Sequence, residues 1–381
     1  MEKKLELIAT STFGLEAVVK REVQALGYDE VKVSDGKITY TADKEGIVRS
    51  NLWLRTADRV LLKMGEFKAT TFTELFEQTK ALPWEEWIEE DGKFTVTGRS
   101  VKSTLFSTPD CQAIVKKAVV EKLKTKYQTE WFKETGAEYT IKVSLLKDIA
   151  TLTIDTTGAG LHKRGYRAQA MEAPLKETIA SALIQLSYWR NNRILLDPFC
   201  GSGTIPIEAA LIGKNIAPGL NRRFASEAWA CIPQELWKRA RIAAFQAIRQ
   251  DEKLKIHASD IDPQAIELAK ENALEAGVDD CIEFSVRPVS QVKPGTEYGV
   301  VICNPPYGNR IGEKEELAEI YHTLGRNFRI RRTWSVYVLT AEEQFEALYG
   351  QKADRKRKLF NGNIRVDYYQ FYGQRPPKAE N

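Results

Sequence analysis

The segment Asp197-Pro-Phe-Cys-Gly-Ser-Gly-Thr204 combines a carboxylate, two glycines and two hydroxyls, and it directly follows the apolar run 194–196. Such a run predicts a buried strand, and ligands of open α/β sheets bind beyond the carboxyl ends of the strands. Gly201 and Gly203 allow the backbone to adopt a positive φ and to approach a ligand closely. The segment therefore predicts a ligand-binding turn.

The residues of this turn argue against two common nucleotide sites. A phosphate-binding Walker loop needs a lysine after its last glycine, where this chain has Thr204. A dinucleotide site needs a third glycine, but Pro206 stands there, and Asp197 would bring a negative charge close to the pyrophosphate. A carboxylate at a strand end instead suits a ligand with a cationic or hydroxyl-rich edge, such as the amino-acid moiety of S-adenosylmethionine.

A second acidic turn, Ser259-Asp-Ile-Asp262, follows the next predicted strand at 254–258. A carboxylate at the end of the second strand of such a sheet can accept hydrogen bonds from both hydroxyls of a ribose. Asp262 is equally typical of a helix cap, because Pro263 follows it. Either turn alone indicates little, but their order along the chain favours a single ligand that carries both an amino-acid moiety and a ribose.

A third turn, Asn304-Pro-Pro-Tyr307, follows the apolar run 299–303. Two adjacent prolines stiffen the backbone, so the Asn304 amide and a neighbouring carbonyl can be held in fixed positions. Such a pair can accept two hydrogen bonds from an exocyclic amino group while the Tyr307 ring stacks on the base. The structural alternative is a proline-rich loop with a tyrosine in the core.

The elements that hold these turns alternate between helix and strand. We expect helices at 174–189, from 205 onward and at 263–276, and strands at 194–196, 254–258, 282–286, 299–303 and 334–340. This alternation predicts a doubly wound, mostly parallel sheet. The N-terminal part predicts smaller α/β units, with strands at 5–9, 93–97, 139–143 and 149–154 and helices at 14–26 and 111–126.

Composition narrows the class of protein. The 381 residues suit two or three domains, and a net charge of +4 is too mild to establish a nucleic-acid partner. A single basic run is more often a solvated helix face, but four of them together favour RNA or DNA. The four runs lie at 116–126, 162–167, 326–332 and 352–358.

Cysteines, histidines and apolar runs also exclude some classes. The five cysteines form no CxxC pair and the three histidines are scattered, so we expect reduced thiols and no metal site. The chain shows no signal peptide and no apolar stretch near the ~18 residues that a membrane helix needs. We therefore expect a soluble, cytoplasmic protein with no membrane partner.

Together these turns resemble the cofactor and target motifs of class I S-adenosylmethionine-dependent amino-methyltransferases. Three further segments are similar to THUMP-domain RNA methyltransferases, and among these to the 23S rRNA guanine-N2 methyltransferases, a family also described as N6-adenine-specific DNA methylases. They are Ile205-Pro-Ile-Glu-Ala-Ala210, Ile216-Ala-Pro-Gly219 with Trp229, and Leu161-His-Lys-Arg-Gly-Tyr-Arg167. The resemblance covers nearly the whole chain.

The resemblance implies an α/β fold with a C-terminal Rossmann-like, doubly wound methyltransferase domain. A ferredoxin-like domain and a THUMP domain, which form an α+β RNA-binding module, would precede it. The implied boundaries are 1–64 for the ferredoxin-like domain, 65–160 for the THUMP domain, 161–173 for a linker and 174–381 for the methyltransferase domain. S-adenosylmethionine is the implied cofactor, and RNA, in particular large-subunit ribosomal RNA or its precursor, is the implied partner.

The resemblance also implies roles for individual residues. The implied cofactor ligands are Asp197, Pro198, Phe199, Cys200, Gly201, Ser202, Gly203, Thr204, Asp260, Ile261, Asp262 and Asn304. Asn304, Pro305, Pro306 and Tyr307 would form the catalytic loop. The segments 98–105 and 109–117 are similar to the THUMP segment of the family, so RNA contacts are implied for Arg99, Lys102, Ser103, Lys116 and Lys117, and also for Lys163, Arg164 and Arg167 in the basic segment.

One departure and two rival interpretations accompany this assignment. The family commonly has an acid after the third strand, where this chain has Arg287-Pro-Val289, so adenine recognition would depend on backbone groups or another side chain. An N6-adenine DNA methyltransferase would use the same Asn-Pro-Pro-Tyr turn, although the THUMP-like module points to RNA. A non-catalytic RNA-binding protein is the other alternative, and the intact turns argue against it.

Overall fold

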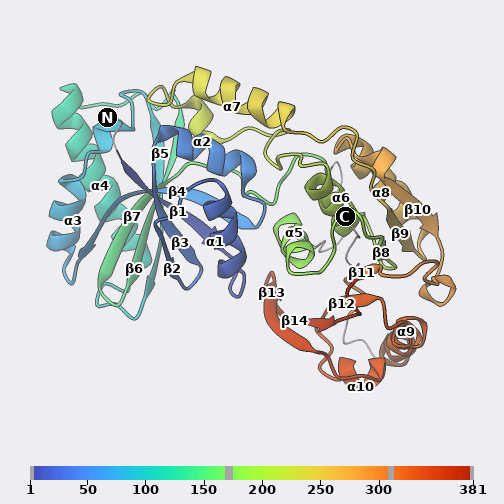
Figure 1. Cartoon of the computed structure of the whole chain (residues 1–381). Coiled ribbons are helices and arrows are strands. Elements are labelled where there is room, and N and C mark those ends of the chain that lie inside the picture. Colours follow the sequence, from blue (N-terminus) through green and yellow to red (C-terminus); the bar gives the residue numbers. More distant parts are fainter. Residues whose placement is uncertain (1–3, 168–174, 308–312, 378–381) are drawn as a thin grey trace. The chain divides into compact units, whose positions relative to one another are not determined.

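The computed structural model describes residues 4–167, 175–307 and 313–377. The chain forms two compact units, neither of which is one continuous segment. The N-terminal unit comprises the residues up to Ser11, Val19–Leu161 and Arg222–Ala243. The C-terminal unit comprises Thr12–Val18, His162–Asn221 and the chain from Ala244 onward. Each unit is built on a seven-stranded sheet (Figure 1).

The sheet of the N-terminal unit has the strand order β2-β3-β1-β4-β7-β6-β5. All its neighbouring strands are antiparallel except β5 and β6, which are parallel. Its strands are β1 Leu5–Ser11, β2 Val31–Ser34, β3 Lys37–Ala42, β4 Ala57–Lys68, β5 Lys93–Val101, β6 Glu138–Leu146 and β7 Ile149–Asp155. Its helices are most of α1 Glu16–Ala25, α2 Lys44–Trp53, α3 Phe72–Lys80, α4 Thr108–Tyr127 and most of α7 Gln234–Gln246.

One face of this sheet carries the core of the unit, because alternate strand residues pack against the helices. Leu7, Tyr40 and Ile141 lie in this core with helical residues such as Val115. The returning segment 222–243 adds Trp229, whose ring stacks on Tyr139 with centroids 4.9 Å apart. The opposite face of the sheet therefore holds the remaining strand residues.

The sheet of the C-terminal unit has the strand order β10-β9-β8-β11-β12-β14-β13. The strands from β10 to β12 are parallel, while β14 and β13 are antiparallel to their neighbours. The strands are β8 Leu195–Asp197, β9 Ile256–Asp260, β10 Ile282–Val286, β11 Val300–Cys303, β12 Ser335–Thr340, β13 Arg355–Asn361 and β14 Ile364–Phe371. The helices are α5 Glu177–Gln185, α6 Thr204–Gly213, α8 Pro263–Glu275, α9 Glu313–Phe328 and α10 Phe345–Tyr349.

Most of the predicted elements are present, and the differences have local causes. The basic run 352–358 continues into β13, which begins at Arg355, and it does not lie on a helix. The boundary predicted between residues 64 and 65 falls inside β4, because this strand pairs with β1 on one side and with β7 on the other. The sequence interpretation included neither helix α7 nor the β13–β14 hairpin.

The RNA contact predicted for Arg164 needs a correction. Arg164 is 3% exposed, and its guanidinium donates to both carboxylate oxygens of Glu208 on α6 at 3.3 Å. Tyr166 and Ser181 also donate to this fully buried carboxylate. A buried guanidinium held in this way is inaccessible to a phosphate, so Arg164 fixes the start of the C-terminal unit to α6.

We predict that Glu208→Ala lowers stability strongly, because it leaves the Arg164 charge buried without its carboxylate. Breaking a buried pair in this way costs about 3–5 kcal/mol. Thermal unfolding should show a large fall in Tm, whereas Glu267→Ala, which breaks an exposed pair with Lys270, should leave Tm nearly unchanged. Equal effects of the two variants would contradict this account.

Candidate active site

The three predicted turns meet at one edge of the C-terminal sheet. Strands β9, β8 and β11 are neighbours and parallel, so their carboxyl ends bring Asp260, Asp197 and Asn304 together. These three residues line one cavity of about 390 Å³. The other lining residues are Leu175, Pro198, Phe199, Cys200, Gly201, Ser202, Thr204, Ile205, Ile261, Pro288, Val289, Pro306 and Ile320.

The glycine turn approaches the cavity with its backbone. Gly201 has a φ of +50° and Gly203 a φ of +84°, both in the region that disfavours side chains. A Cβ on Gly203 would also come within 3.1 Å of Ala269 Cβ, so the turn packs closely on α8. The Gly201 amide donates to Asp260 Oδ2 at 2.9 Å, which ties the first turn to the second.

Asp197 is a buried carboxylate with an unused acceptor. One oxygen accepts the Phe199 amide at 3.1 Å, while Oδ2 is buried and has no hydrogen-bond partner among the described residues. Burial raises the pKa of Asp197 well above its ordinary value, and the negative charge of Asp260 adds to this effect. A cationic ligand would supply the missing partner, so the site fits the positively charged amino-acid moiety of S-adenosylmethionine.

The second acidic turn separates the roles of its two carboxylates. Asp260 lines the cavity, and its Oδ1 accepts the Asp262 amide at 3.1 Å. Asp262 caps α8 by accepting the Gln264 amide at 2.9 Å, and it does not line the cavity. Asp262 therefore acts as a helix cap, as the alternative interpretation expected. Asp260 is the carboxylate of this turn that a ligand in the cavity could reach.

The Asn-Pro-Pro-Tyr turn is anchored by residues that the sequence did not reveal. The Tyr321 hydroxyl on α9 donates to the Pro306 carbonyl at 3.1 Å, and Asn361 at the end of β13 donates to the Tyr307 hydroxyl at 3.1 Å. Asn304 Oδ1 is buried without a hydrogen-bond partner among the described residues. The turn therefore presents a fixed, unused acceptor. Pro305 and Tyr307, like Gly203, do not line the cavity.

The segment Arg287-Pro-Val289, which stands where the family commonly has an acid, gives the cavity an apolar wall. The Arg287 amide donates to the Asp260 carbonyl at 2.9 Å, which leads Pro288 and Val289 to the cavity. Ile261 lines the same cavity. A flat base such as adenine can pack against these side chains without an acidic partner. No sequence motif signalled this wall, because apolar residues at these positions are equally typical of a core.

The residues predicted to contact RNA are scattered. Lys116 and Lys117 are exposed on α4, Arg99 lies on β5, and Lys102 and Ser103 follow β5. Lys163 is exposed as well.

Arg167, for which an RNA contact is also predicted, contacts the wall of the cofactor cavity. Its guanidinium donates to Thr204 Oγ1 at 2.7 Å and to the Leu175 carbonyl at 3.4 Å, and it pairs with Glu177 at 3.4 Å. Thr204 and Leu175 both line the cavity, so Arg167 helps to hold these two parts of the cavity wall in place.

The thiols near the site are poorly suited to covalent catalysis. Burial raises the pKa of Cys200, and the charges of Asp197 and Asp260 raise it further, so the thiol stays protonated.

Among the described residues no cluster of three or more His, Cys, Asp or Glu side chains could hold a metal ion. Nor does the described chain contain a helix long and apolar enough to cross a membrane.

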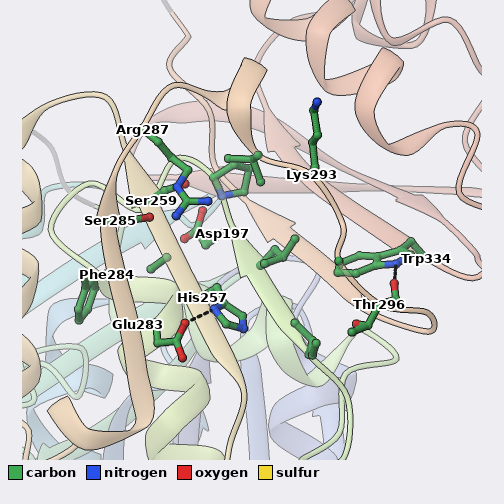
Figure 2. Close-up of a pocket in the computed structure, with 16 residues that line it drawn as sticks. Asp197, His257, Ser259, Glu283, Phe284, Ser285, Arg287, Lys293, Thr296 and Trp334 are labelled. Atoms are coloured by element: carbon green, nitrogen blue, oxygen red, sulfur yellow. Dashed lines mark hydrogen bonds and ion pairs between the residues drawn. The ribbon is translucent and has the colours of Figure 1, made fainter.

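A larger cavity, of about 580 Å³, lies over strands β8, β9 and β10 (Figure 2). It shares Asp197 and Pro198 with the smaller cavity, but its other lining residues are different. In it, His257 Nδ1 lies 2.8 Å from a carboxylate oxygen of Glu283, and the Trp334 indole donates to the Thr296 carbonyl at 2.7 Å. None of its lining residues comes from the glycine turn after Pro198 or from the Asn-Pro-Pro-Tyr turn, so the smaller cavity is the candidate active site.

Comparison with known families agrees with this geometry. Residues 164–370 match the family model described as "RMKL-like, methyltransferase domain". Residues 6–61 match the RlmL ferredoxin-like domain, and residues 69–155 match the THUMP domain. The chain belongs to the RMKL-like methyltransferase family. The predicted family and the predicted fold, with ferredoxin-like, THUMP and Rossmann-like methyltransferase parts, are confirmed.

Individual relatives extend over the whole chain. YpsC of Bacillus subtilis, named as a candidate RNA methyltransferase, is 54% identical over 99% of this chain and 98% of its own length. The ribosomal RNA large subunit methyltransferase K/L of Psychromonas ingrahamii is 34% identical over 92% of this chain. This chain spans only 48% of the length of that protein.

Solved structures show the same architecture. A Listeria monocytogenes protein, described as a predicted N6-adenine-specific DNA methylase, has a TM-score of 0.94 and 53% identity over 98% of this chain and 97% of its own. The methyltransferase candidate SMU.472, solved in complex with SAH, the demethylated cofactor, has a TM-score of 0.93 and 44% identity over 99% of this chain and 100% of its own. The chain is a methyltransferase, and S-adenosylmethionine is its cofactor.

We predict opposite effects of Asp197→Asn on stability and on cofactor binding. A carboxyl whose pKa is raised by folding loses stability as pH rises from about 4 towards the raised pKa, and the loss then stays constant. The neutral amide avoids this loss, so Tm should exceed that of the unsubstituted protein at pH 8, and the difference should shrink towards pH 5. Cofactor affinity should fall at least about tenfold, because the positive charge loses its carboxylate.

The matched control is Asp262→Asn, which makes the same chemical change outside the cavity and keeps a good helix cap. Thermal unfolding across pH and calorimetric titration with S-adenosylmethionine provide the two measurements. A Tm difference that does not change with pH would contradict the buried-charge account.

We predict that Tyr321→Phe slows methyl transfer without weakening cofactor binding, because it removes the hydrogen bond to the Pro306 carbonyl. One such bond is worth about 1 kcal/mol, or roughly fivefold in kcat. Tyr368→Phe is the control, since its buried hydroxyl donates instead to the Leu183 carbonyl on α5. Tritium transfer from labelled cofactor measures the rate, and equal rates for the two variants would show that Tyr321 does not position the turn.

Proposed function

We propose that this chain transfers a methyl group from S-adenosylmethionine to an exocyclic amino group of a base in RNA, with guanine N2 of large-subunit ribosomal RNA or its precursor as the target. The observation that carries the proposal is the buried Asn304 Oδ1, which has no hydrogen-bond partner among the described residues and lies in the cavity that the glycine turn also lines. A buried acceptor without a partner costs free energy, and the amine of a bound base would satisfy it.

The residues of the turn would orient the amine. S-adenosylmethionine, when bound, supplies an electrophilic methyl group on a positively charged sulfur. Asn304 Oδ1, on the cavity wall, would accept one amine hydrogen, and the carbonyl of Pro305, which follows it outside the cavity wall, would accept the other. Two such bonds would favour a pyramidal nitrogen and fix the direction of its lone pair. The proton becomes acidic only as the new bond forms, so water can take it without a dedicated base. Orientation of this kind supplies about 7–11 kcal/mol in favourable cases.

Cofactor contacts would divide among the remaining lining residues. Asp197 would pair with the positively charged amino-acid moiety, Asp260 would accept the ribose hydroxyls, and Pro288 with Val289 would pack against the adenine. Gly201 would allow the ligand to approach, since a Cβ there would point into open space. Each assignment rests on the position of the residue in the cavity wall.

The choice of RNA rests on the N-terminal unit and on the relatives. The match of residues 69–155 to the THUMP domain supports an RNA substrate. The names of the Bacillus and Psychromonas relatives point to RNA and to large-subunit ribosomal RNA. A ribosomal RNA target would place the activity in the cytoplasm.

Adenine N6 of DNA is the second candidate target. The same two acceptors can hold the adenine amine, and the Listeria protein of similar structure has that description. The two candidates differ in the nucleoside that carries the methyl group.

The test is mass spectrometry of nucleosides from a strain that lacks the gene. We expect N2-methylguanosine in large-subunit RNA to fall and to return with the unsubstituted gene but not with Asn304→Ala. In vitro, this variant should lose at least about a hundredfold in transfer while it still binds the cofactor. Asn191→Ala is the control, because its amide donates to the Gly213 carbonyl and does not line the cavity.

Two outcomes would overturn parts of the proposal. Loss of N6-methyladenine from DNA, with RNA unchanged, would favour the second candidate. Near-normal transfer by Asn304→Ala would remove the role of the amide acceptor, whatever the target.

A further inference from the structure

The open face of the N-terminal sheet, opposite its helical core, contains a cavity of about 390 Å³. Its floor includes Ile8 on β1 and Leu61 on β4, which are 3% and 7% exposed and pair directly across the two strands. Neither side chain belongs to the helical core of the unit. Both side chains therefore lie on the face opposite the helical core and form the floor of the cavity, with only a small part of their surface exposed.

Four cations line this cavity, with Asp35 as its one lining carboxylate. Arg59 and Lys142 are bound to the buried Asp155 beneath them, at 2.6 Å and 3.1 Å. The other two cations are Lys37 on β3 and Arg99 on β5. Among the described residues, no carboxylate lies within ion-pair distance of Lys37 or Arg99.

Lys37 and Arg99 line the same cavity although four strands lie between β3 and β5 in the sheet. Burial lowers the pKa of Lys37, and the positive charge of Arg99 lowers it further. Two cations that disfavour one another in this way would be stabilised by a bound anion.

Hydroxyl groups complete the wall of the cavity. Thr97, Ser144, Thr151 and Thr153 line it between the cations, and Ser144 already accepts a hydrogen bond from Arg99 Nε at 3.0 Å. Hydroxyls of this kind can donate to phosphate oxygens and accept from ribose hydroxyls. The volume lies at the lower end of the range for ligand pockets, which suits a single nucleotide unit and not a duplex.

We propose that this cavity binds a phosphodiester and its nucleoside in a single-stranded segment of RNA. Lys37 and Arg99 contact the phosphate, and the base or sugar packs on Ile8 and Leu61. The inference rests on the proposed RNA substrate and specifies where the N-terminal unit holds it. Single-stranded segments are the form in which RNA bases become accessible to such a pocket.

This site differs from the one that the basic helix would offer. On β5 the side chains alternate, so Phe94 belongs to the helical core while Arg99 lies on the open face. Lys116 and Lys117 are exposed on α4, which packs on the core side of the sheet. The two pairs of cations therefore lie on opposite faces of one sheet and can be tested against each other.

The experiment measures binding of the full-length protein to a fluorescent single-stranded RNA across salt concentrations. The double variant Lys37→Ala with Arg99→Ala should bind about 10–100-fold more weakly, and its salt slope should be shallower by about 0.7, since the contact with one phosphate is lost. The comparison variant, Lys116→Ala with Lys117→Ala, removes the same charge from the other face, and it should lose less binding than the pocket variant. Arg99→Ala alone, at an exposed position, serves if the double variant is unstable.

The outcomes separate this inference from the proposed function. Methyl transfer to RNA by the unsubstituted protein, together with normal binding by the pocket variant, overturns the pocket and leaves the function standing. If only the α4 variant binds RNA more weakly, the RNA contacts the helical face of the sheet, and the proposed pocket is overturned. A duplex that binds as tightly through the same two residues excludes the single-stranded form. Absence of both RNA binding and transfer in the unsubstituted protein overturns both proposals.

Discussion

The hydrogen bond from the Gly201 amide to Asp260 Oδ2 joins two strand ends that the chain separates by 59 residues. Parallel neighbours β8 and β9 end at the same edge, and this bond fixes the glycine turn against the second acidic turn. Neither carboxylate could serve a common ligand if the turns moved independently. Asn304 enters the same cavity because β11 flanks β8 on its other side.

Much of this arrangement could be predicted because it depends on local sequence. A strand followed by a glycine turn specifies where the backbone bends, and the order of parallel strands specifies which turns meet. The contacts that hold the turns could not be predicted. Tyr321 and Asn361 reach the Asn-Pro-Pro-Tyr turn from α9 and β13, and nothing in their own segments distinguishes them from other polar residues of a helix or strand end.

Basic residues were the least predictable part of the sequence, since charge alone does not specify direction. Arg164 and Lys163 are adjacent, yet one is buried against Glu208 and the other is exposed. Arg99 and Lys116 both belong to segments similar to the THUMP family, yet they lie on opposite faces of the sheet. Only the register of the strands and the packing of α4 decide which cations share a surface.

The unused acceptors of the cofactor cavity show how stability and function are balanced. Buried polar atoms are nearly always hydrogen-bonded, and the Arg164–Glu208 network follows that rule. Asp197 Oδ2 and Asn304 Oδ1, in one cavity, have no such partner among the described residues, and the proposed cation and amine would complete their hydrogen bonds. These two acceptors therefore stay available to ligands, and the hydrogen bond from Tyr321 to the Pro306 carbonyl restrains the Asn304 turn against relaxing to satisfy its acceptor internally.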